Sequence, residues 1–152
     1  VQLARLTEKT VRFFNDEPRM AMISYSNFGS DSAAGSSKVH EAVRRLHEEY
    51  PDMIVDGELQ LGYALNREGR DSKWPFSKLA GMDVNTLVFP NLTSARSSYK
   101  ILQCLDVDAE IIGPIQMGLN KPIHFVDFES SVREVLNVTA VAVIDAYVQK
   151  LK

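Results

Sequence analysis

Short apolar runs alternate along this chain with longer segments whose apolar residues recur at the period of a helix. The runs cover residues 20–25, 53–57, 86–89 and 109–113, and glycine or polar residues follow each of them. Strands separated by helices favour parallel pairing, with helices covering both faces of the sheet. The order of elements therefore predicts a three-layer α/β/α domain with a mostly parallel sheet.

Composition and charge exclude several classes of protein. The net charge of −3 offers no basic face for nucleic acid, and no apolar run reaches the roughly 18 residues of a membrane-spanning helix. The single cysteine, Cys104, is spaced as a helix residue with Ile101 and Leu105, so we expect it to be an inert core residue. One cysteine fits a reducing compartment, and a cytoplasmic location is expected.

Polar residues that follow strands are candidates for a ligand site, because parallel sheets bind ligands at the carboxyl ends of their strands. Asp56 and Glu58 could bind a cation or act as acid and base, or they could instead be a solvated pair or brace a loop. The histidines His40, His47 and His124 match no metal-binding spacing, so no metal site is expected.

The loop "SNFGSDSAAGSS" could cradle a phosphate, since its glycines permit close backbone approach. It matches neither of the common nucleotide-binding motifs, and a flexible capped loop is the alternative.

The segment "HFVDFESSVREVLN" contains the start of the last helix. Ser131 and Glu134 are spaced as a capping box, and a helix start of this kind suits an anion. Yet Asp127, Phe128 and Glu129 lead into it, and two of them are negatively charged. Residues 131–150 are predicted to be helical.

Five stretches together resemble the phosphate acetyltransferase (phosphotransacetylase) family, in that family's order. They are "SYSNFGS", "DGELQ", "TLVFPNL" followed by "YK", "IGPIQMGLNKPIH" and "SSVREVLNVTAVAVIDA". Their wording is most similar to the phosphotransacetylase-like region at the C-terminus of bacterial NADP-dependent malic enzymes. The resemblance implies an isocitrate/isopropylmalate dehydrogenase-like fold, of which residues 1–152 would form the C-terminal half. This half would be one wall of a cleft between two lobes, and the final helix would pack on the first lobe.

Active members of the family carry a Ser-Arg pair before the last helix and an acid one turn into it. The resemblance places Asp127 at the serine, Phe128 at the arginine and Glu134 at the acid. Phe128 cannot make the bidentate contact of an arginine with a phosphoryl group, and Asp127 would repel that group. The resemblance therefore implies that this region is not catalytic.

What remains is a cleft wall for a coenzyme A thioester. The resemblance implies a regulatory and assembly region that senses acetyl-CoA in a homo-oligomeric malic enzyme. The N-terminal domains of that enzyme would convert malate into pyruvate and CO2, with NADP and a divalent metal. An active phosphate acetyltransferase, which makes acetyl phosphate and CoA from acetyl-CoA and phosphate, is one alternative. A pure oligomerisation module is another. The residues expected to contact the ligand are Ser26, Asn27, Ser30, Asn91, Tyr99, Gln116, Lys121, Ser130 and Arg133.

Overall fold

The computed structural model describes residues 1–105 and 111–150 and confirms the α/β class predicted from the sequence. The chain divides into two compact units, residues 1–101 and residues 102–152. Among the described helices, none is long and apolar enough to cross a lipid bilayer.

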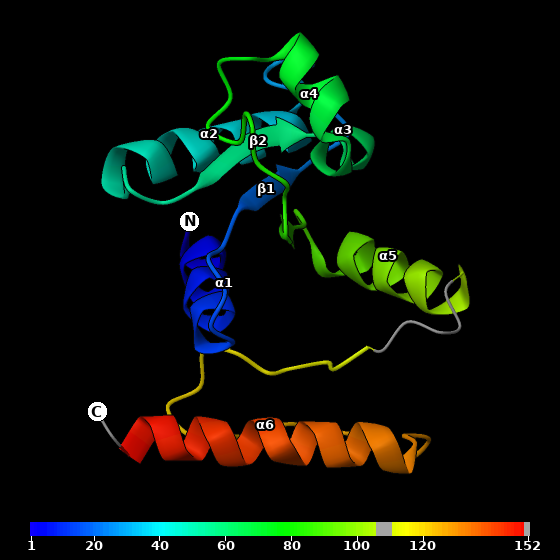
Figure 1. Ribbon diagram of the computed structural model, residues 1–152. Helices are drawn as coiled ribbons and strands as arrows, with labels where there is room; N and C mark the ends of the chain where they lie inside the picture. Colours follow the sequence, from blue (N-terminus) through cyan, green and yellow to red (C-terminus); the bar gives the residue numbers. More distant parts are fainter. Residues whose placement is uncertain (106–110, 151–152) are drawn as a thin grey trace. The chain divides into compact units, whose positions relative to one another are not determined.

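Unit 1, residues 1–101, is built on a parallel sheet of three strands (Figure 1). The strands are β1 (Met20–Ile23), β2 (Val55–Leu59) and β3 (Thr86–Val88), and β1 lies between the other two. Both of its neighbours run parallel to it. Three of the predicted strands are therefore confirmed close to their expected positions.

Side chains of β1 alternate between two cores, as expected for a strand that is covered on both faces. Met20 and Met22 belong to one core, and Ala21 and Ile23 belong to the other. The first core is completed mainly by α1 (Gln2–Phe13) and α2 (Ala34–Glu49), and the second by α3 (Leu61–Leu65) and the chain that follows it. The contributing residues are Ala4, Val39, Val43 and Leu46 in the first core, and Ala64 and Leu79 in the second.

A register shift in the pairing of β1 with β2 places the last residue of β2 on the opposite face of the sheet. Met22 pairs with Gly57, but the next residue of β1 pairs with Leu59, so Glu58 is left out of the pairing. Val55 consequently lies in the first core and Leu59 in the second. Only glycine fits at position 57, because its φ is 143° and a Cβ would lie 2.6 Å from the carbonyl oxygen of Met22.

Residues 67–83, whose sequence shows no clean helical periodicity, contain a helix, α4 (Arg67–Lys73). The Asn66 side chain caps it by accepting a hydrogen bond from the backbone N–H three residues on. Arg70 is fully buried and donates to three backbone carbonyl groups, which pins the segment to unit 1. The sequence of this helix shows no apolar periodicity, because most of its residues are charged and its one buried side chain is an arginine.

The helix α5 (Leu92–Leu105) presents no buried residue over its described length. Cys104 is exposed, and the prediction that it is a core residue is wrong. Its neighbour Leu105 is 78% exposed. Helical spacing identified an apolar stripe correctly, but spacing does not decide whether another element covers that stripe.

Unit 2 contains the final helix α6 (Val132–Lys150), as predicted. The expected strand over residues 109–113 is not formed by residues 111–113, and residues 109 and 110 lie outside the described part. Gly113 has a φ of 138° and precedes Pro114, which has no N–H to donate to a ladder. An apolar run alone was therefore insufficient evidence for a strand.

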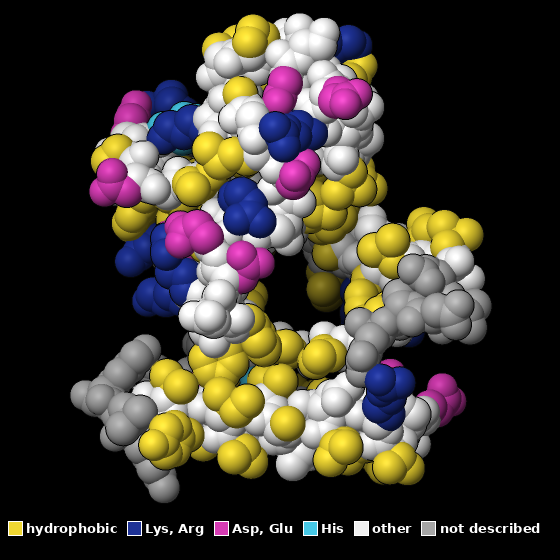
Figure 2. Space-filling view, viewed as in Figure 1, with side chains coloured by type: hydrophobic (Ala, Val, Ile, Leu, Met, Phe, Trp, Pro, Cys, Tyr) yellow, Lys and Arg dark blue, Asp and Glu magenta, His cyan; other side chains and the backbone are white. Residues whose placement is uncertain are grey.

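Apolar side chains occur along much of α6, and Figure 2 shows hydrophobic groups following one another on its surface. Val138 and Val141 are buried. Others are largely exposed, among them Val132 at 88% and Leu136 at 66%. A helix that is apolar on more than one side usually packs against more than one neighbour.

Candidate functional site

The chain segments at the carboxyl ends of β1 and β2 are joined by the side chain of Glu58. Its Oε1 accepts hydrogen bonds from the Ser26 hydroxyl (2.9 Å) and from the Gly29 N–H (2.6 Å). Its Oε2 lies 3.1 Å from Nδ1 of His40, which projects from α2. Glu58 is fully buried, whereas the His40 side chain is 57% exposed. One carboxylate therefore organises the whole loop that follows β1.

Two opposing effects act on the pKa of Glu58. Burial raises the pKa, because the carboxylate loses its hydration, but hydrogen bonds from Gly29, from the backbone of Glu58, from Ser26 and from His40 lower it. The hydrogen bonds prevail, and the pKa lies below its ordinary value of 4.5. The loop is thus anchored on an ionised group at neutral pH.

Ser26 and Asn27, predicted to contact a ligand, are buried and hydrogen-bonded within the chain. The Ser26 hydroxyl accepts from the Asp31 N–H (3.1 Å), and the Asn27 Oδ1 accepts from the Gln60 N–H (2.9 Å). Ser30 is exposed, although its hydroxyl accepts from the Asn27 N–H (3.0 Å). Ser30 alone of the three presents much of its surface to solvent, so Ser26 and Asn27 would shape a ligand site rather than line it.

Asp56 is a second buried carboxylate on β2, and it braces a different segment. Its Oδ2 accepts from the Ser77 hydroxyl (2.8 Å) and from the Lys78 N–H (2.7 Å), while His47 Nε2 lies 3.7 Å from Oδ1. Of the roles considered for Asp56 and Glu58, the contacts support loop bracing. Each carboxylate fastens one loop to the sheet.

Asn91 and Tyr99 lie at the start of α5 and within it. The Asn91 Oδ1 accepts from the Ser94 N–H (2.9 Å), which is the geometry of a helix cap. Tyr99 is half-buried, and the Lys100 ammonium lies 5.8 Å from its ring centroid. These two residues thus belong to one helix and its cap.

The predicted capping box at the start of α6 is confirmed. The Glu134 N–H donates to the Ser131 hydroxyl (3.2 Å), and the Ser131 N–H donates to Glu134 Oε2 (2.7 Å). Glu134, the residue placed at the family's acid position, therefore serves at least as a structural cap. Two backbone donors that an anion could have used are satisfied within the chain.

The residues leading into α6 stand in solvent. Asp127 and Glu129 are exposed, and the Phe128 side chain is fully exposed. A tight turn holds them, in which the Asp127 N–H donates to the Ser130 hydroxyl (3.0 Å) and the Ser130 N–H donates to the Asp127 carbonyl oxygen (3.1 Å). The turn thus presents two carboxylates and an aromatic ring beside the helix start.

The remaining candidates also belong to unit 2. Gln116 and Lys121 are exposed on the irregular chain before α6, and Gln116 Nε2 donates to the Met117 carbonyl oxygen (3.1 Å). Arg133 is exposed in the first turn of α6, with Ser130 just before that turn. The candidates are thus divided between the two units, five in unit 1 and four in unit 2.

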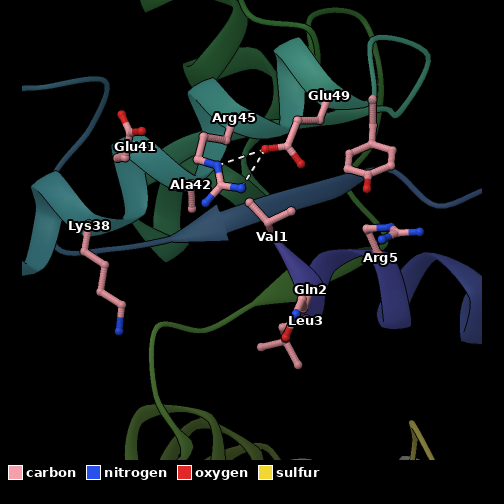
Figure 3. Close-up of a pocket in the computed structure, with 10 residues that line it drawn as sticks. Val1, Gln2, Leu3, Arg5, Lys38, Glu41, Ala42, Arg45 and Glu49 are labelled. Atoms are coloured by element: carbon pink, nitrogen blue, oxygen red, sulfur yellow. Dashed lines mark hydrogen bonds and ion pairs between the residues drawn. The ribbon is translucent and has the colours of Figure 1, made fainter.

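A hollow of about 650 Å³, which the sequence did not predict, lies between the start of α1 and α2 (Figure 3). The Arg5 guanidinium lies over the Tyr50 ring, 4.7 Å from its centroid, and Arg45 donates to Glu49 (2.7 Å). Some of the charged side chains that line the hollow therefore already interact with other lining residues. The lining residues are Val1, Gln2, Leu3, Arg5, Lys38, Glu41, Ala42, Arg45, Glu49 and Tyr50.

Comparison with known proteins connects these features with one family. Residues 1–143 match the family described as Phosphate acetyl/butaryl transferase. The chain is 39% identical over 145 residues to the NADP-dependent malic enzyme of Salmonella typhimurium, which covers 95% of this chain and 19% of that enzyme. It is 41% identical to the phosphate acetyltransferase of Treponema pallidum, covering 88% of this chain and 40% of that protein.

A phosphotransacetylase structure from Streptococcus pyogenes superposes with a TM-score of 0.84 at 38% identity, covering 99% of this chain and 44% of that one. The chain therefore spans about a fifth of the malic enzyme and less than half of the phosphotransacetylase.

Proposed function

This chain belongs to the phosphate acetyltransferase family, and from that premise we propose that it is a regulatory and assembly region of a cytoplasmic NADP-dependent malic enzyme. Oxidative decarboxylation of malate, with NADP and a divalent metal, would be carried out by other domains of the same protein. The long malic enzymes that match almost all of this chain support the assignment.

The chemistry of the turn before α6 carries the proposal that the region is not catalytic. Transfer of an acetyl group to phosphate builds up negative charge, which needs cationic or N–H donors aimed at the reacting oxygens. Here Asp127 and Glu129 are exposed carboxylates, and Phe128 offers no donor. The capping box also occupies the N–H of Glu134. A phosphate approaching this turn would be repelled by the two carboxylates and would find no cationic side chain to bind it within the turn.

Acetyl-CoA is the effector that the proposal assigns to this region. A phosphotransacetylase-like wall without a working phosphate end can still hold the thioester, and binding changes activity only if the ligand prefers one of two states of the enzyme. Exposed polar residues are suited to direct contact, while the loop held by Glu58 would supply a fixed surface. In unit 1 the exposed candidates are Ser30 and Asn91, and in unit 2 they are Gln116, Lys121 and Arg133; each unit is considered by itself.

The test is acetyl-CoA control of malate decarboxylation in the full-length protein. We expect acetyl-CoA to alter the rate in the wild type, and Arg133→Ala or Lys121→Ala to weaken the response without changing the basal rate. Lys9→Ala, an exposed lysine on α1, is the matched control. An effector response that survives both substitutions, and also survives deletion of residues 1–152, would refute the regulatory assignment.

The transferase alternative predicts acetyl phosphate formation from acetyl-CoA and phosphate. We expect none above a heat-inactivated control when the region is assayed together with its complementary lobe. Substantial turnover would restore the alternative and contradict the repulsion argued for Asp127.

Assembly is the second part of the proposal, and the exposed apolar residues of α6 support it. Val143 and Tyr147 are 64% and 65% exposed, and Val135 and Thr139 are also exposed. Exposed apolar surface of this kind commonly marks a contact with another lobe or subunit. Sedimentation of the full-length protein should show a homo-oligomer, and Val143→Asp together with Tyr147→Asp should weaken it. If the double substitution leaves the oligomeric state unchanged, α6 does not contribute to the interface between subunits.

A further inference from the structure

The hollow between the start of α1 and α2 is a surface that the proposed function does not use. It lies within unit 1, and its volume of about 650 Å³ is in the range of pockets that take small organic ligands. The residues that line it include none of the loop after β1, none of α5 and none of the turn before α6. A ligand bound there would therefore not occupy the surface assigned to acetyl-CoA.

The floor of this hollow is apolar. Val1, Ala42 and Tyr50 are half-buried and pack against the first core, and Leu3, which is 52% exposed, adds an apolar side chain that solvent can reach. Because the core holds three of these side chains in place, the floor does not have to form around a ligand. Such a floor favours a ligand with an apolar body, since contact with it removes apolar surface from water.

The two acidic side chains of the hollow already have counter-ions on α2. Glu41 accepts hydrogen bonds from Arg44 Nε (2.8 Å) and Nη2 (2.6 Å). Glu49 accepts from Arg45 Nε (2.9 Å) and Nη2 (2.7 Å), as Figure 3 shows. The pKa of Glu41 is lowered chiefly by its hydrogen bond from Arg44, so this carboxylate is ionised at neutral pH.

Two cationic side chains of the hollow keep unused hydrogen-bond donors. The Arg5 guanidinium lies over the Tyr50 ring, which covers its flat face and leaves its N–H edge available. Within the described part of the chain, the side chains of Arg5 and Lys38 form no hydrogen bond and no ion pair. Figure 3 shows these two residues on opposite sides of the hollow. The hollow thus combines an apolar floor with positive charge at its rim.

An arginine beside an apolar floor matches an organic carboxylate. A carboxylate accepts two parallel hydrogen bonds from a guanidinium, and the Tyr50 ring already supports that of Arg5. Glu41 and Glu49 would repel additional negative charge, which favours a single carboxylate over a polyphosphate.

We propose that this hollow binds a small organic monoanion with an apolar body, an aromatic or branched-chain carboxylate. The apolar body packs on Ala42 and Tyr50, the carboxylate pairs with Arg5, and Lys38 adds a weaker attraction from the other side. The site goes beyond the proposed function, because neither its residues nor its ligand are those of acetyl-CoA control.

Calorimetric titration of the full-length protein with three probes tests the site. The probes are 3-phenylpropionate, its uncharged amide, and acetate, which has the carboxylate without the apolar body. We expect Arg5→Gln to raise the Kd for 3-phenylpropionate about fivefold, the effect of one exposed ion pair, and Lys38→Gln to raise it about twofold. The amide and acetate should bind more weakly than 3-phenylpropionate, and Arg5→Gln should leave the affinity for the amide unchanged.

Ala42→Leu tests the floor separately from the charges. Leucine suits a helix and would fill part of the hollow while Arg5 and Lys38 remain. We expect the Kd for 3-phenylpropionate to rise about fourfold, the order set by the loss of one methylene contact. Circular dichroism at 222 nm should be unchanged, and if Ala42→Leu lowers it, the two charge variants alone decide. Lys9→Gln removes an exposed lysine of α1 outside the hollow and should change nothing.

The outcomes that overturn the proposal are distinct from failure of the proposed function. The site is rejected if 3-phenylpropionate does not bind the wild type, if the amide binds as tightly, or if Arg5→Gln or folded Ala42→Leu leaves the Kd unchanged. Saturating acetyl-CoA should not displace the probe, and displacement would also reject the site. Absence of acetyl-CoA binding, by contrast, would refute the regulatory assignment and leave the expectations for 3-phenylpropionate as they stand.

Discussion

The loop after β1 and the turn before α6 look alike in sequence but differ in how they use their polar groups. Both combine serines, acids and a phenylalanine near the end or the start of an element. The loop is fastened by Glu58 of β2, whose buried carboxylate receives hydrogen bonds from the Ser26 hydroxyl and the Gly29 N–H. In the turn, Asp127 and Glu129 are exposed. Polar composition therefore identifies segments of interest but does not separate bracing groups from groups that face solvent.

Phenylalanine shows the same contrast. Phe28 packs between two other aromatic rings and has a strained backbone, whereas Phe128 is fully exposed. Substitutions in the two regions should consequently differ in their cost to folding. The single tryptophan, Trp74, contacts Phe28 and reports on unit 1 by fluorescence.

The largest effect is expected for Gly57→Ala. A Cβ at this position would lie 2.6 Å from the Met22 carbonyl oxygen, at a φ of 143°. We expect the free energy of unfolding of unit 1 to fall by about 3 kcal/mol or more, measured by urea unfolding with Trp74 fluorescence. Gly62→Ala is the control, because a Cβ there meets nothing within 4 Å. Equal losses in both variants would contradict the close approach of β1 and β2.

Glu58→Gln should cost about 2 kcal/mol at pH 7, because charge-assisted hydrogen bonds to a buried carboxylate are lost. The folded-state pKa of Glu58 is lowered, so its ionised form stabilises the fold above the ordinary pKa of 4.5. This contribution disappears as the pH falls below that value. Unfolding measured from pH 7 to pH 3 should therefore show the difference between wild type and Glu58→Gln shrinking in acid. A constant difference would exclude ionisation as its source.

Ser131→Ala removes the cap of α6 and should destabilise this helix by about 1 kcal/mol. Amide hydrogen exchange in the first turns of α6 is the direct measurement, since unit 1 need not respond. Ser130→Ala is the matched control, because the Ser130 hydroxyl accepts from Asp127 and not from a helix N–H. Greater loss of protection in Ser130→Ala would show that the turn, rather than the cap, holds the helix start.

The smallest effect is expected for Phe128→Ala. The ring is fully exposed, so its removal should change the free energy of unfolding by no more than about 0.5 kcal/mol. Urea unfolding followed by circular dichroism at 222 nm measures it, because α6 contributes strongly to that signal. A loss above about 1 kcal/mol would mean that Phe128 packs in the folded protein and that the contrast with Phe28 does not hold.

Local patterns were sufficient for the elements whose signals lie close together in sequence. Ser131 and Glu134 form their capping box with each other, three residues apart, so no distant contact was needed to predict it. The three strands were predicted from apolar runs with polar ends, because burial on both faces demands such runs. The family resemblance extended this reading to the fold, since its motifs lie in order along most of the chain.

The sequence by itself thus determined the α/β class, the family and the approximate positions of several elements. Tertiary structure decided which polar groups are buried, because Glu58 meets Ser26 and Gly29 only when β1 and β2 lie side by side. It also decided that Arg70 is buried and Cys104 exposed, against their usual tendencies. A side chain is buried only if a distant segment packs against it. The spacing of residues within one segment does not show whether such a segment exists.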